Sequence, residues 1–211
     1  MKKALYILVF LLSGNICFAQ KDKIAFYGGI EWQPAIRQYQ PAVHLNVRGY
    51  INDHVSLGAA LSYTSEKHAE NFGYLADRTR SNHATLNFLV QNDVINNDKV
   101  FFSTYLSTGL YFLSLVNPDE TSTQTQYNEV DGMWIVNQYE VPRKLNRDLF
   151  YNIQGGVDFS VKIGSMTKEN ISVYLTTRAG YQFVLGNGDV ANGNQFTKPV
   201  VSLGVTFKGN K

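Results

Sequence analysis

The chain has 211 residues, of which 44% are apolar, 13% aromatic and only 17% charged. Abundant aromatic residues and sparse charge exclude a disordered, collagen-like or coiled-coil chain. The mean hydropathy of −0.19 excludes a bundle of membrane helices, and beyond residue 20 no stretch approaches the roughly 20 consecutive apolar residues of a spanning helix. The chain is therefore either soluble or a membrane β-barrel, in which apolar and polar residues alternate.

Residues 1–19 have the layout of a secretory signal peptide. Lys2 and Lys3 supply a positive start, a short apolar stretch follows, and Ala19 precedes the expected cleavage site. The sequence therefore predicts a signal peptide over 1–19 and a single mature domain over 20–211.

The lone cysteine and the charge balance restrict the chemistry of the mature chain. Cys17 raises the alternative of a lipoprotein, which Ile16 disfavours because that processing requires a small residue before the cysteine. Cleavage removes Cys17, so no disulfide is expected. It also removes two of the 19 basic residues and no acid, which leaves 17 basic and 17 acidic residues. A formal charge of zero gives no electrostatic argument for nucleic acid as a partner.

Alternation of apolar and polar residues predicts β-strands along the whole mature chain. In residues 149–163 the odd positions are nearly all apolar, and the even positions from Asn152 onward are polar or glycine. A period of two over this length indicates a strand, because a helix would scatter these residues around its circumference. The same pattern predicts strands at 24–36, 41–51, 54–66, 81–94, 99–115, 148–163, 170–185 and 199–208.

Connection lengths give a second, independent signal. Long and short connections alternate, as they do in an up-and-down barrel with short periplasmic turns and longer extracellular loops. The connection at 37–40 is the one short exception among the long ones. The other short connections are 52–53, 95–98 and 164–169, and the long, polar ones are 67–80, 116–147 and 186–198.

Strand length and the composition of the polar face favour lipid outside the barrel. The strands at 99–115, 148–163 and 170–185 reach or exceed the roughly 9–11 residues needed to cross a bilayer at a tilt. The polar face is rich in serine and glycine, which suits a narrow interior. A lipocalin-like barrel requires an apolar lumen, and the sequence indicates no second apolar face. We therefore predict an all-β fold, an eight-stranded antiparallel up-and-down transmembrane β-barrel.

The signal peptide, the strand pattern and the last strand at 200–207 resemble the small outer-membrane β-barrel family of Gram-negative bacteria, the OmpX-like or porin-family barrel domain. The Ala19–Gln20 junction further resembles exported proteins of the Bacteroidota. The resemblance implies a location in the cell outer membrane, contact with outer-membrane lipid and lipopolysaccharide, and insertion by the barrel-assembly machinery.

The resemblance also assigns a role to the last strand. In the family a glycine and a near-terminal aromatic residue form the signal that the assembly machinery reads, and Gly204 and Phe207 match those positions. The chain departs from the family pattern because residues 208–211 follow, where the family commonly ends at the aromatic residue. The alternative is an ordinary amphipathic last strand.

No catalytic or metal-binding motif is present in the sequence. Triads of barrel enzymes are assembled across strands, and Ser81 and His83 are the first pair to check for such a role. The sequence predicts a protein that is not an enzyme and that has no cofactor and no metal. The acidic residues of the long loop are expected to be solvated, because their spacing matches no calcium loop: Asp119, Glu120, Glu129 and Asp131.

Aromatic residues in the 116–147 connection allow two interpretations. Trp134, Tyr127 and Tyr139 either anchor an envelope or extracellular partner, or continue strand pairing above the membrane and cover the barrel mouth. A second set of aromatic residues is expected at the membrane interfaces: Trp32, Tyr39, Tyr63 and Tyr181.

Strand parity directs four charged residues into the lumen: Glu31, Arg48, Asp158 and Arg178. Charges in a narrow interior must be paired or hydrogen-bonded. We hypothesise a closed polar plug in which the two arginines neutralise the two acids, with Gln154, Gln182 and Asn46 on the same face. The competing interpretation is a water-filled passage.

Three functions remain open at this point. The preferred one is a non-enzymatic outer-membrane barrel with a plugged polar interior, whose extracellular loops contact an envelope or extracellular partner. The second is a narrow channel for small solutes. The third is a barrel enzyme that acts on lipid A or peptides.

Overall fold

The computed structural model describes residues 23–130, 133–166 and 170–209. The expected signal peptide therefore lies outside the described residues. In the segment around 131–132, the description includes the backbone but not the side chains of residues 126–130, 133–135, 137 and 139.

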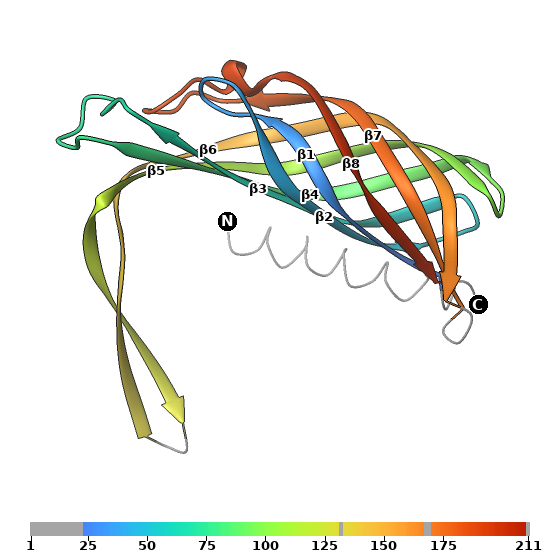
Figure 1. Cartoon of the computed structure of the whole chain (residues 1–211), viewed down its shortest axis with the longest axis horizontal. Helices are drawn as coiled ribbons and strands as arrows, with labels where there is room; N and C mark the ends of the chain where they lie inside the picture. Colours follow the sequence, from blue (N-terminus) through green and yellow to red (C-terminus); the bar gives the residue numbers. More distant parts are fainter. Residues whose placement is uncertain (1–22, 131–132, 167–169, 210–211) are drawn as a thin grey trace, which may run out of the picture.

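Eight antiparallel strands form one closed barrel, in which each strand pairs with its neighbours in the chain and the last strand pairs with the first (Figure 1). The predicted all-β, eight-stranded up-and-down barrel is confirmed. A short 3-10 helix, η1 (Gly193–Phe196), lies between the last two strands. The strands are β1 (Ile24–Pro34), β2 (Tyr39–Tyr50), β3 (Val55–His68), β4 (Thr79–Asn96), β5 (Val100–Val130), β6 (Met133–Met166), β7 (Ile171–Leu185) and β8 (Lys198–Gly209).

Alternation places one set of side chains inside the barrel and the other outside. In β7, Thr176 and Arg178 are buried in the interior, whereas Leu175 and Tyr181 are exposed on the outer wall. Closure through the pairing of β1 with β8 satisfies the backbone hydrogen bonds of both edge strands. The start of β1 and the end of β8 consequently lie at the same end of the barrel, which we call the periplasmic end; the opposite end is the extracellular end.

The prediction of a loop over 116–147 is wrong, because β5 and β6 continue through this segment as a two-stranded hairpin. The register shifts between Leu115 and Val116 and again between Asn117 and Thr121. Beyond these irregularities the hairpin bends away from the barrel (Figure 1). The segment forms strands despite its polarity because threonine, which is favoured in strands, recurs at every second position from Thr121 to Thr125.

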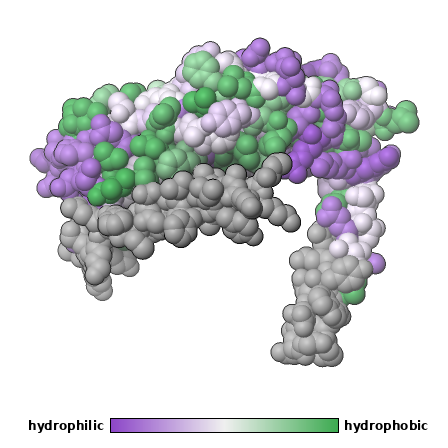
Figure 2. Space-filling model, turned by 180° about the vertical axis from the view of Figure 1, so that it is seen from behind, coloured by the Kyte–Doolittle hydropathy of each residue, from purple (hydrophilic) through white to green (hydrophobic). Residues whose placement is uncertain are grey.

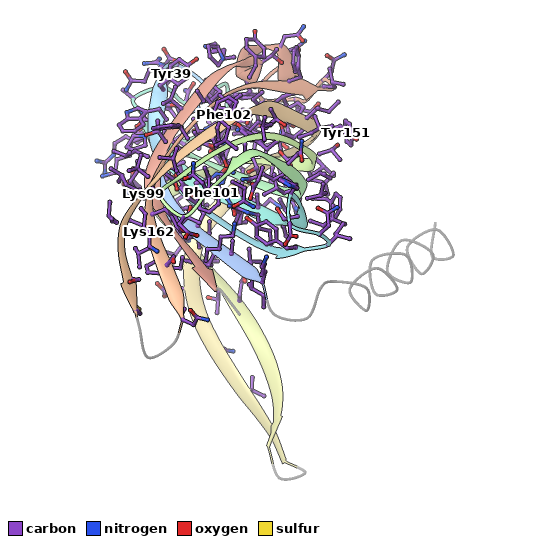
Figure 3. All side chains as sticks on the ribbon, turned by 90° about the vertical axis from the view of Figure 1, so that its right-hand side faces the viewer. Tyr39, Lys99, Phe101, Phe102, Tyr151 and Lys162 are labelled. Atoms are coloured by element: carbon purple, nitrogen blue, oxygen red, sulfur yellow. The ribbon has the colours of Figure 1, made fainter. Side chains whose placement is uncertain are left out.

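The outer wall carries a belt of apolar and aromatic side chains. Figure 2 shows hydrophobic residues over much of the visible barrel wall, with hydrophilic residues gathered mainly toward its two ends. The four aromatic residues expected at the interfaces are 41–50% exposed on this wall, and Tyr39 is seen at its edge in Figure 3. Among the described residues, no helix is long and apolar enough to cross a membrane.

Candidate functional site

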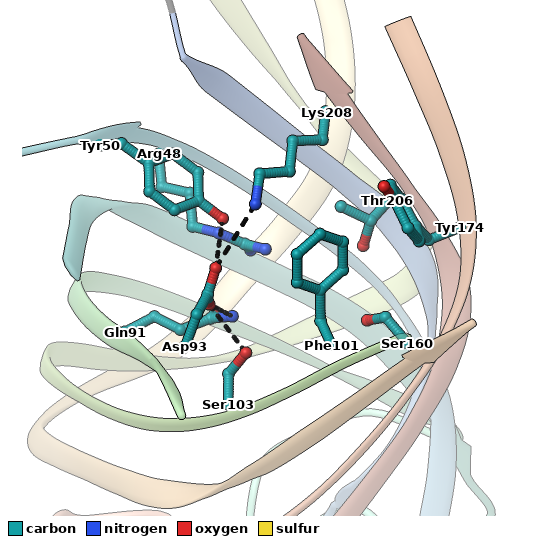
Figure 4. A pocket seen from close by; sticks show the side chains of 10 residues that line it. All are labelled: Arg48, Tyr50, Gln91, Asp93, Phe101, Ser103, Ser160, Tyr174, Thr206 and Lys208. Carbon is teal, nitrogen blue, oxygen red and sulfur yellow. Dashed lines mark hydrogen bonds and ion pairs between the residues drawn. The ribbon is translucent and has the colours of Figure 1, made fainter. Parts of the chain in front are cut away.

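The periplasmic end of the interior is organised around Asp93 of β4, which is buried (Figure 4). Tyr50 and Ser103 each donate a hydrogen bond of 2.8 Å to the Asp93 carboxylate. The Lys208 ammonium lies 3.5 Å from the same carboxylate and 3.9 Å from the centroid of the Phe101 ring. The space left between these side chains is about 10 Å³, which holds at most about one water molecule.

The middle of the interior contains a buried ion pair between Arg178 of β7 and Asp158 of β6. The guanidinium donates two parallel hydrogen bonds of 2.7 and 2.6 Å to the carboxylate, and each residue is only 2% exposed. The guanidinium also lies 4.2 Å from the ring centroid of Tyr105 and 5.5 Å from that of Tyr27. Two-point binding and stacking on aromatic rings together fix the orientation of the arginine.

Glu31 of β1 lies beside this pair and contacts histidine, not arginine. Its carboxylate is 3.2 Å from Nδ1 of His44 and accepts a hydrogen bond of 3.4 Å from Gln154. His44 Nε2 is in turn 3.4 Å from the Arg178 guanidinium. The contacts therefore continue from Glu31 through His44 to the Arg178–Asp158 pair.

Arg48 does not neutralise either of the two acids as hypothesised. The guanidinium donates a hydrogen bond of 3.0 Å to the side-chain oxygen of Asn46, and no ion pair among the described residues involves Arg48. All four residues of the hypothesised lumen network are buried. Glu31, Arg178 and Asp158 are connected through His44, whereas Arg48 contacts Asn46 and is not part of this chain of contacts. The partners differ because the stagger between neighbouring strands sets the depth of each side chain in the barrel.

A buried hydrogen-bonded relay lies between the central ion pair and the extracellular end. The Ser81 hydroxyl is 2.7 Å from Nε2 of His68 and 2.9 Å from Nε2 of His83, and His83 Nδ1 is 2.7 Å from the Tyr111 hydroxyl. Glu66 lies 3.7 Å from His68. Ser81 and His83 are brought together as a catalytic pair would require, but both are 0% exposed. A substrate therefore cannot reach the Ser81 hydroxyl in this conformation.

The extracellular end of the interior is closed by an apolar cluster, which we call the apolar cap. The expectation of no second apolar face is therefore wrong at this end. Phe196 from η1 stacks on Tyr111 with 4.9 Å between ring centroids and contacts Phe150 at 5.9 Å. The apolar cap comprises Tyr111, Leu113, Phe150, Val184, Ala191 and Phe196.

The loop that carries Phe196 is held in place by Asp148 of β6. The buried Asp148 carboxylate accepts backbone hydrogen bonds from Asp189 and Val190 at 2.9 Å and from Ala191 at 3.3 Å. Such bonds to a charged acceptor are stronger than neutral ones. The loop between β7 and β8 is thus folded inward over the barrel mouth, and its anchor is a residue that sequence analysis did not single out.

Two of the four acidic residues in the long loop, Asp119 and Glu120, pair with arginine side chains. Asp119 accepts hydrogen bonds of 2.5 and 3.1 Å from Arg78, and this bonding raises the Arg78 pKa. Glu120 pairs with Arg143 at 2.7 Å. The Glu129 side chain and Asp131 lie outside the described residues. Within the described part of the chain, no group of three His, Cys, Asp or Glu residues could hold a metal ion.

The aromatic residues proposed to bind a partner lie on the projecting hairpin. Backbone pairing joins Trp134 to Glu129, Tyr127 to Val136 and Tyr139 to Gln124. This pairing shows that strand pairing continues through the segment. The side chains of Trp134, Tyr127 and Tyr139 lie outside the described residues, so their role in binding stays a prediction.

The two residues expected to form the assembly signal lie on β8. A Cβ atom at Gly204 would collide with the backbone of Gly29 and the ring of Tyr27, so the close approach of β8 to β1 requires glycine at this position. Phe207 lies on the other side of the strand, with its ring 6.5 Å from that of Phe26. Lys208, where the chain departs from the family pattern, points inward to Asp93.

The fold and site define a closed eight-stranded barrel with an apolar outer wall and a filled interior. No family model and no curated protein matches the chain. Solved structures with a similar fold include the N-terminal β-barrel domain of OprF from Pseudomonas aeruginosa, at 14% identity over 88% of this chain and 96% of that one, with a TM-score of 0.40.

Two further solved structures have a similar fold. Ail of Yersinia pestis, solved in complex with the heparin analogue sucrose octasulfate, is 11% identical over 89% of this chain and 96% of that one, with a TM-score of 0.40. Neisserial surface protein A is 13% identical over 90% of this chain and 96% of that one, with a TM-score of 0.38. At these identities the comparisons describe a shared barrel fold only.

Proposed function

We propose that this protein is a non-enzymatic outer-membrane β-barrel with a closed interior, whose β5–β6 hairpin is held outside the membrane to bind an envelope or extracellular partner. The observation that carries the proposal is the filled interior, in which the Asp93 cluster, the Arg178–Asp158 pair and the apolar cap follow one another along the barrel. The barrel then serves as an anchor and the hairpin as the binding element.

The membrane location is supported by the combination of a closed hydrogen-bonded wall and an apolar outer surface. Closure leaves no strand edge with unpaired backbone groups exposed to lipid, which is the requirement for a β-structure in a bilayer. Boiled and unboiled samples should migrate differently on a detergent gel, and the protein should remain in the outer-membrane fraction after a carbonate wash. Recovery as a soluble periplasmic protein would contradict the proposal.

The filled interior supports an anchor over a channel. Planar-bilayer recordings of the purified protein should show little or no stable conductance, because the paired Arg178 and Asp158 side chains fill the middle of the interior and the extracellular mouth is covered. The double substitution Phe196→Ala and Phe150→Ala removes two rings of the apolar cap and so widens the mouth. Recordings of this variant serve as the comparison for those of the wild type. Steady, reproducible openings in the unmutated protein would instead establish the alternative, a narrow channel for small solutes.

Partner binding is assigned to the hairpin because its strands extend well past the barrel wall. A variant in which residues 119–140 are replaced by a tight turn should keep the heat-dependent gel shift but lose the partner. The substitutions Tyr127→Ala and Trp134→Ala should weaken the same interaction in the full-length hairpin. The readout is chemical cross-linking on intact cells, and unchanged cross-linking in the shortened variant would contradict the assignment.

A hydrolytic function is disfavoured by the burial of Ser81. If the protein acted on lipid A or peptides, the substitution Ser81→Ala would abolish the turnover. We expect no turnover by the wild type, measured by mass spectrometry of the incubated lipid or peptide.

Assembly through the barrel-assembly machinery, with Gly204 and Phe207 as its signal, is part of the same proposal and predicts accumulation of unassembled protein after Phe207→Ala.

A further inference from the structure

Arg48 of β2 carries a positive charge inside the barrel without an acidic partner. The residue is only 6% exposed, and its guanidinium donates a hydrogen bond of 3.0 Å to the side-chain oxygen of Asn46. Its Nε atom is buried and has no hydrogen-bond partner, and no ion pair among the described residues involves Arg48. A buried charge without a counter-charge is costly, because the hydration of the ion is lost and nothing replaces it.

Asp93 does not supply the missing negative charge, because other groups already hold its carboxylate. One carboxylate oxygen accepts a hydrogen bond from Tyr50 and lies 3.5 Å from the Lys208 ammonium. The other oxygen accepts a hydrogen bond of 2.8 Å from Ser103. Lys208 and Asp93 therefore balance each other, and the charge of Arg48 remains uncompensated.

Arg48 and Lys208 line the same small cavity at the periplasmic end (Figure 4). Its volume is about 10 Å³, which is about the room that one water molecule occupies. The charged residues of the lining are Arg48, Lys208 and Asp93, so that two positive charges and one negative charge give a formal charge of +1. The lining also contains five residues with hydroxyl groups: Tyr50, Ser103, Ser160, Tyr174 and Thr206.

We propose that this cavity binds one monovalent anion of the size of chloride, as the counter-ion of Arg48. The charge of the lining favours a monovalent ion, because a single negative charge brings the sum to zero and a divalent anion would exceed it. The volume favours chloride, which is only slightly larger than water, over phosphate, sulfate or the carboxylate of an organic acid. The N–H groups of a guanidinium donate hydrogen bonds and accept none, so their natural partner is an anion.

The position of the cavity gives the ion a route of entry from the periplasmic end. Arg48 and Lys208 both retain 6% exposure, and β2 ends at Tyr50, two residues beyond Arg48. The opposite end of the interior is closed by the apolar cap. The inference goes beyond the proposed anchor function and does not depend on the partner of the hairpin, because it concerns an ion that stabilises the closed interior.

The test is urea unfolding of the full mature chain in lipid vesicles at constant ionic strength, with sodium gluconate replaced stepwise by sodium chloride. Gluconate is too large for the cavity. An ion that binds only the folded protein lowers the equilibrium constant for unfolding, by about a hundredfold when its concentration is about one hundred times the dissociation constant. The variant is Arg48→Gln. The matched control is Lys99→Gln, which removes the same charge from an exposed position between β4 and β5 (labelled in Figure 3).

Chloride should stabilise the wild type and the Lys99→Gln control, and the gain should reach a plateau as the site fills. Arg48→Gln should show no such gain, because the charge that holds the ion is gone. An equal gain in Arg48→Gln, or the same stability of the wild type in chloride and in gluconate, would overturn the proposal.

Anomalous scattering from bromide, which replaces chloride in such sites, locates the ion without any substitution. Crystals of the wild type grown in sodium bromide should contain an anomalous peak beside the Arg48 guanidinium, within the cavity. If chloride stabilised the protein but bromide were absent from this cavity, the stabilising ion would bind elsewhere and the proposal would be wrong.

Discussion

The two halves of the barrel interior are closed by different physical means. Toward the periplasmic end and in the middle, charged side chains pair inside a narrow lumen, with Arg178 on Asp158 and Lys208 on Asp93. At the extracellular end, Phe196 is folded in from a loop and packs against Tyr111 and other apolar residues. The polar half depends on exact partners, because an unpaired buried charge is costly, whereas the cap depends on filled volume.

The largest expected effect comes from breaking the central ion pair. Arg178→Ala leaves the Asp158 carboxylate buried without its cation, which should lower the free energy of unfolding by about 3–5 kcal/mol. Urea titration of the protein in lipid vesicles measures this change. The double variant Arg178→Ala with Asp158→Ala should be more stable than the single one, because no charge is left unpaired. A double variant less stable than Arg178→Ala would contradict the role of the pair.

Removal of an aromatic ring from the apolar cap should be the next largest effect. Phe196→Ala should lower the free energy of unfolding by about 3 kcal/mol, since a fully buried phenyl ring is lost. Adding the second substitution, Phe150→Ala, should lower the free energy of unfolding further. In the polar half, by contrast, the second substitution is expected to restore stability. If adding Phe150→Ala restored stability instead, the contrast between the two regions would be wrong.

A smaller effect is expected from the anchor of the cap loop. Asp148→Asn removes the charge that accepts the Asp189 and Val190 amides, and should destabilise the protein by about 1.5–3 kcal/mol. Hydrogen exchange should accelerate at these two amides while the amides of β7 remain protected. Uniform acceleration throughout the barrel would show that Asp148 stabilises the whole fold and not the loop.

The smallest effect lies in the turn between β2 and β3, at the rim of the polar half. The hydrogen bond and charge of Lys23 lower the pKa of Asp53, so the pair stabilises the protein above the ordinary pKa of aspartate and this contribution is lost as the pH falls. Lys23→Ala should raise the Asp53 pKa toward its ordinary value, as measured by NMR titration. Because Asp53 is fully exposed, the melting temperature should not change measurably.

The polar half was largely predictable from sequence, and the extracellular end was not. Parity alone places Asp158 and Arg178 in the lumen, because side chains alternate strictly between the two faces of a strand. It cannot choose partners between strands that are distant in sequence, so the contact of Glu31 with His44 was not foreseen. The depth of each side chain depends on the stagger of the closed barrel, which no local pattern encodes.

The apolar cap and the hairpin had signals that a simple alternation rule overlooks. The run from Leu110 to Val116 is almost continuously apolar, which is typical of a strand that is covered on both faces. The hairpin segment is polar and resembles a loop in composition, but its alternating threonines from Thr121 to Thr125 favour strands. The apolar cap and the hairpin both lie at the extracellular end, where side chains and strands extend beyond the part of the barrel wall that contacts lipid.

The pairing of β1 with β8 determines how this chain can fold. Eight residue pairs join the two strands, from Ala25 with Lys208 to Trp32 with Val201. The backbone pairing of β1 therefore cannot be completed until β8 has been synthesised. Contacts between residues so far apart in the chain are slow to form, and partly assembled sheets expose hydrogen-bonding edges that invite aggregation. Ring closure can therefore follow only after β8 has been made, and a truncation that removes β8 should yield aggregates instead of a smaller barrel.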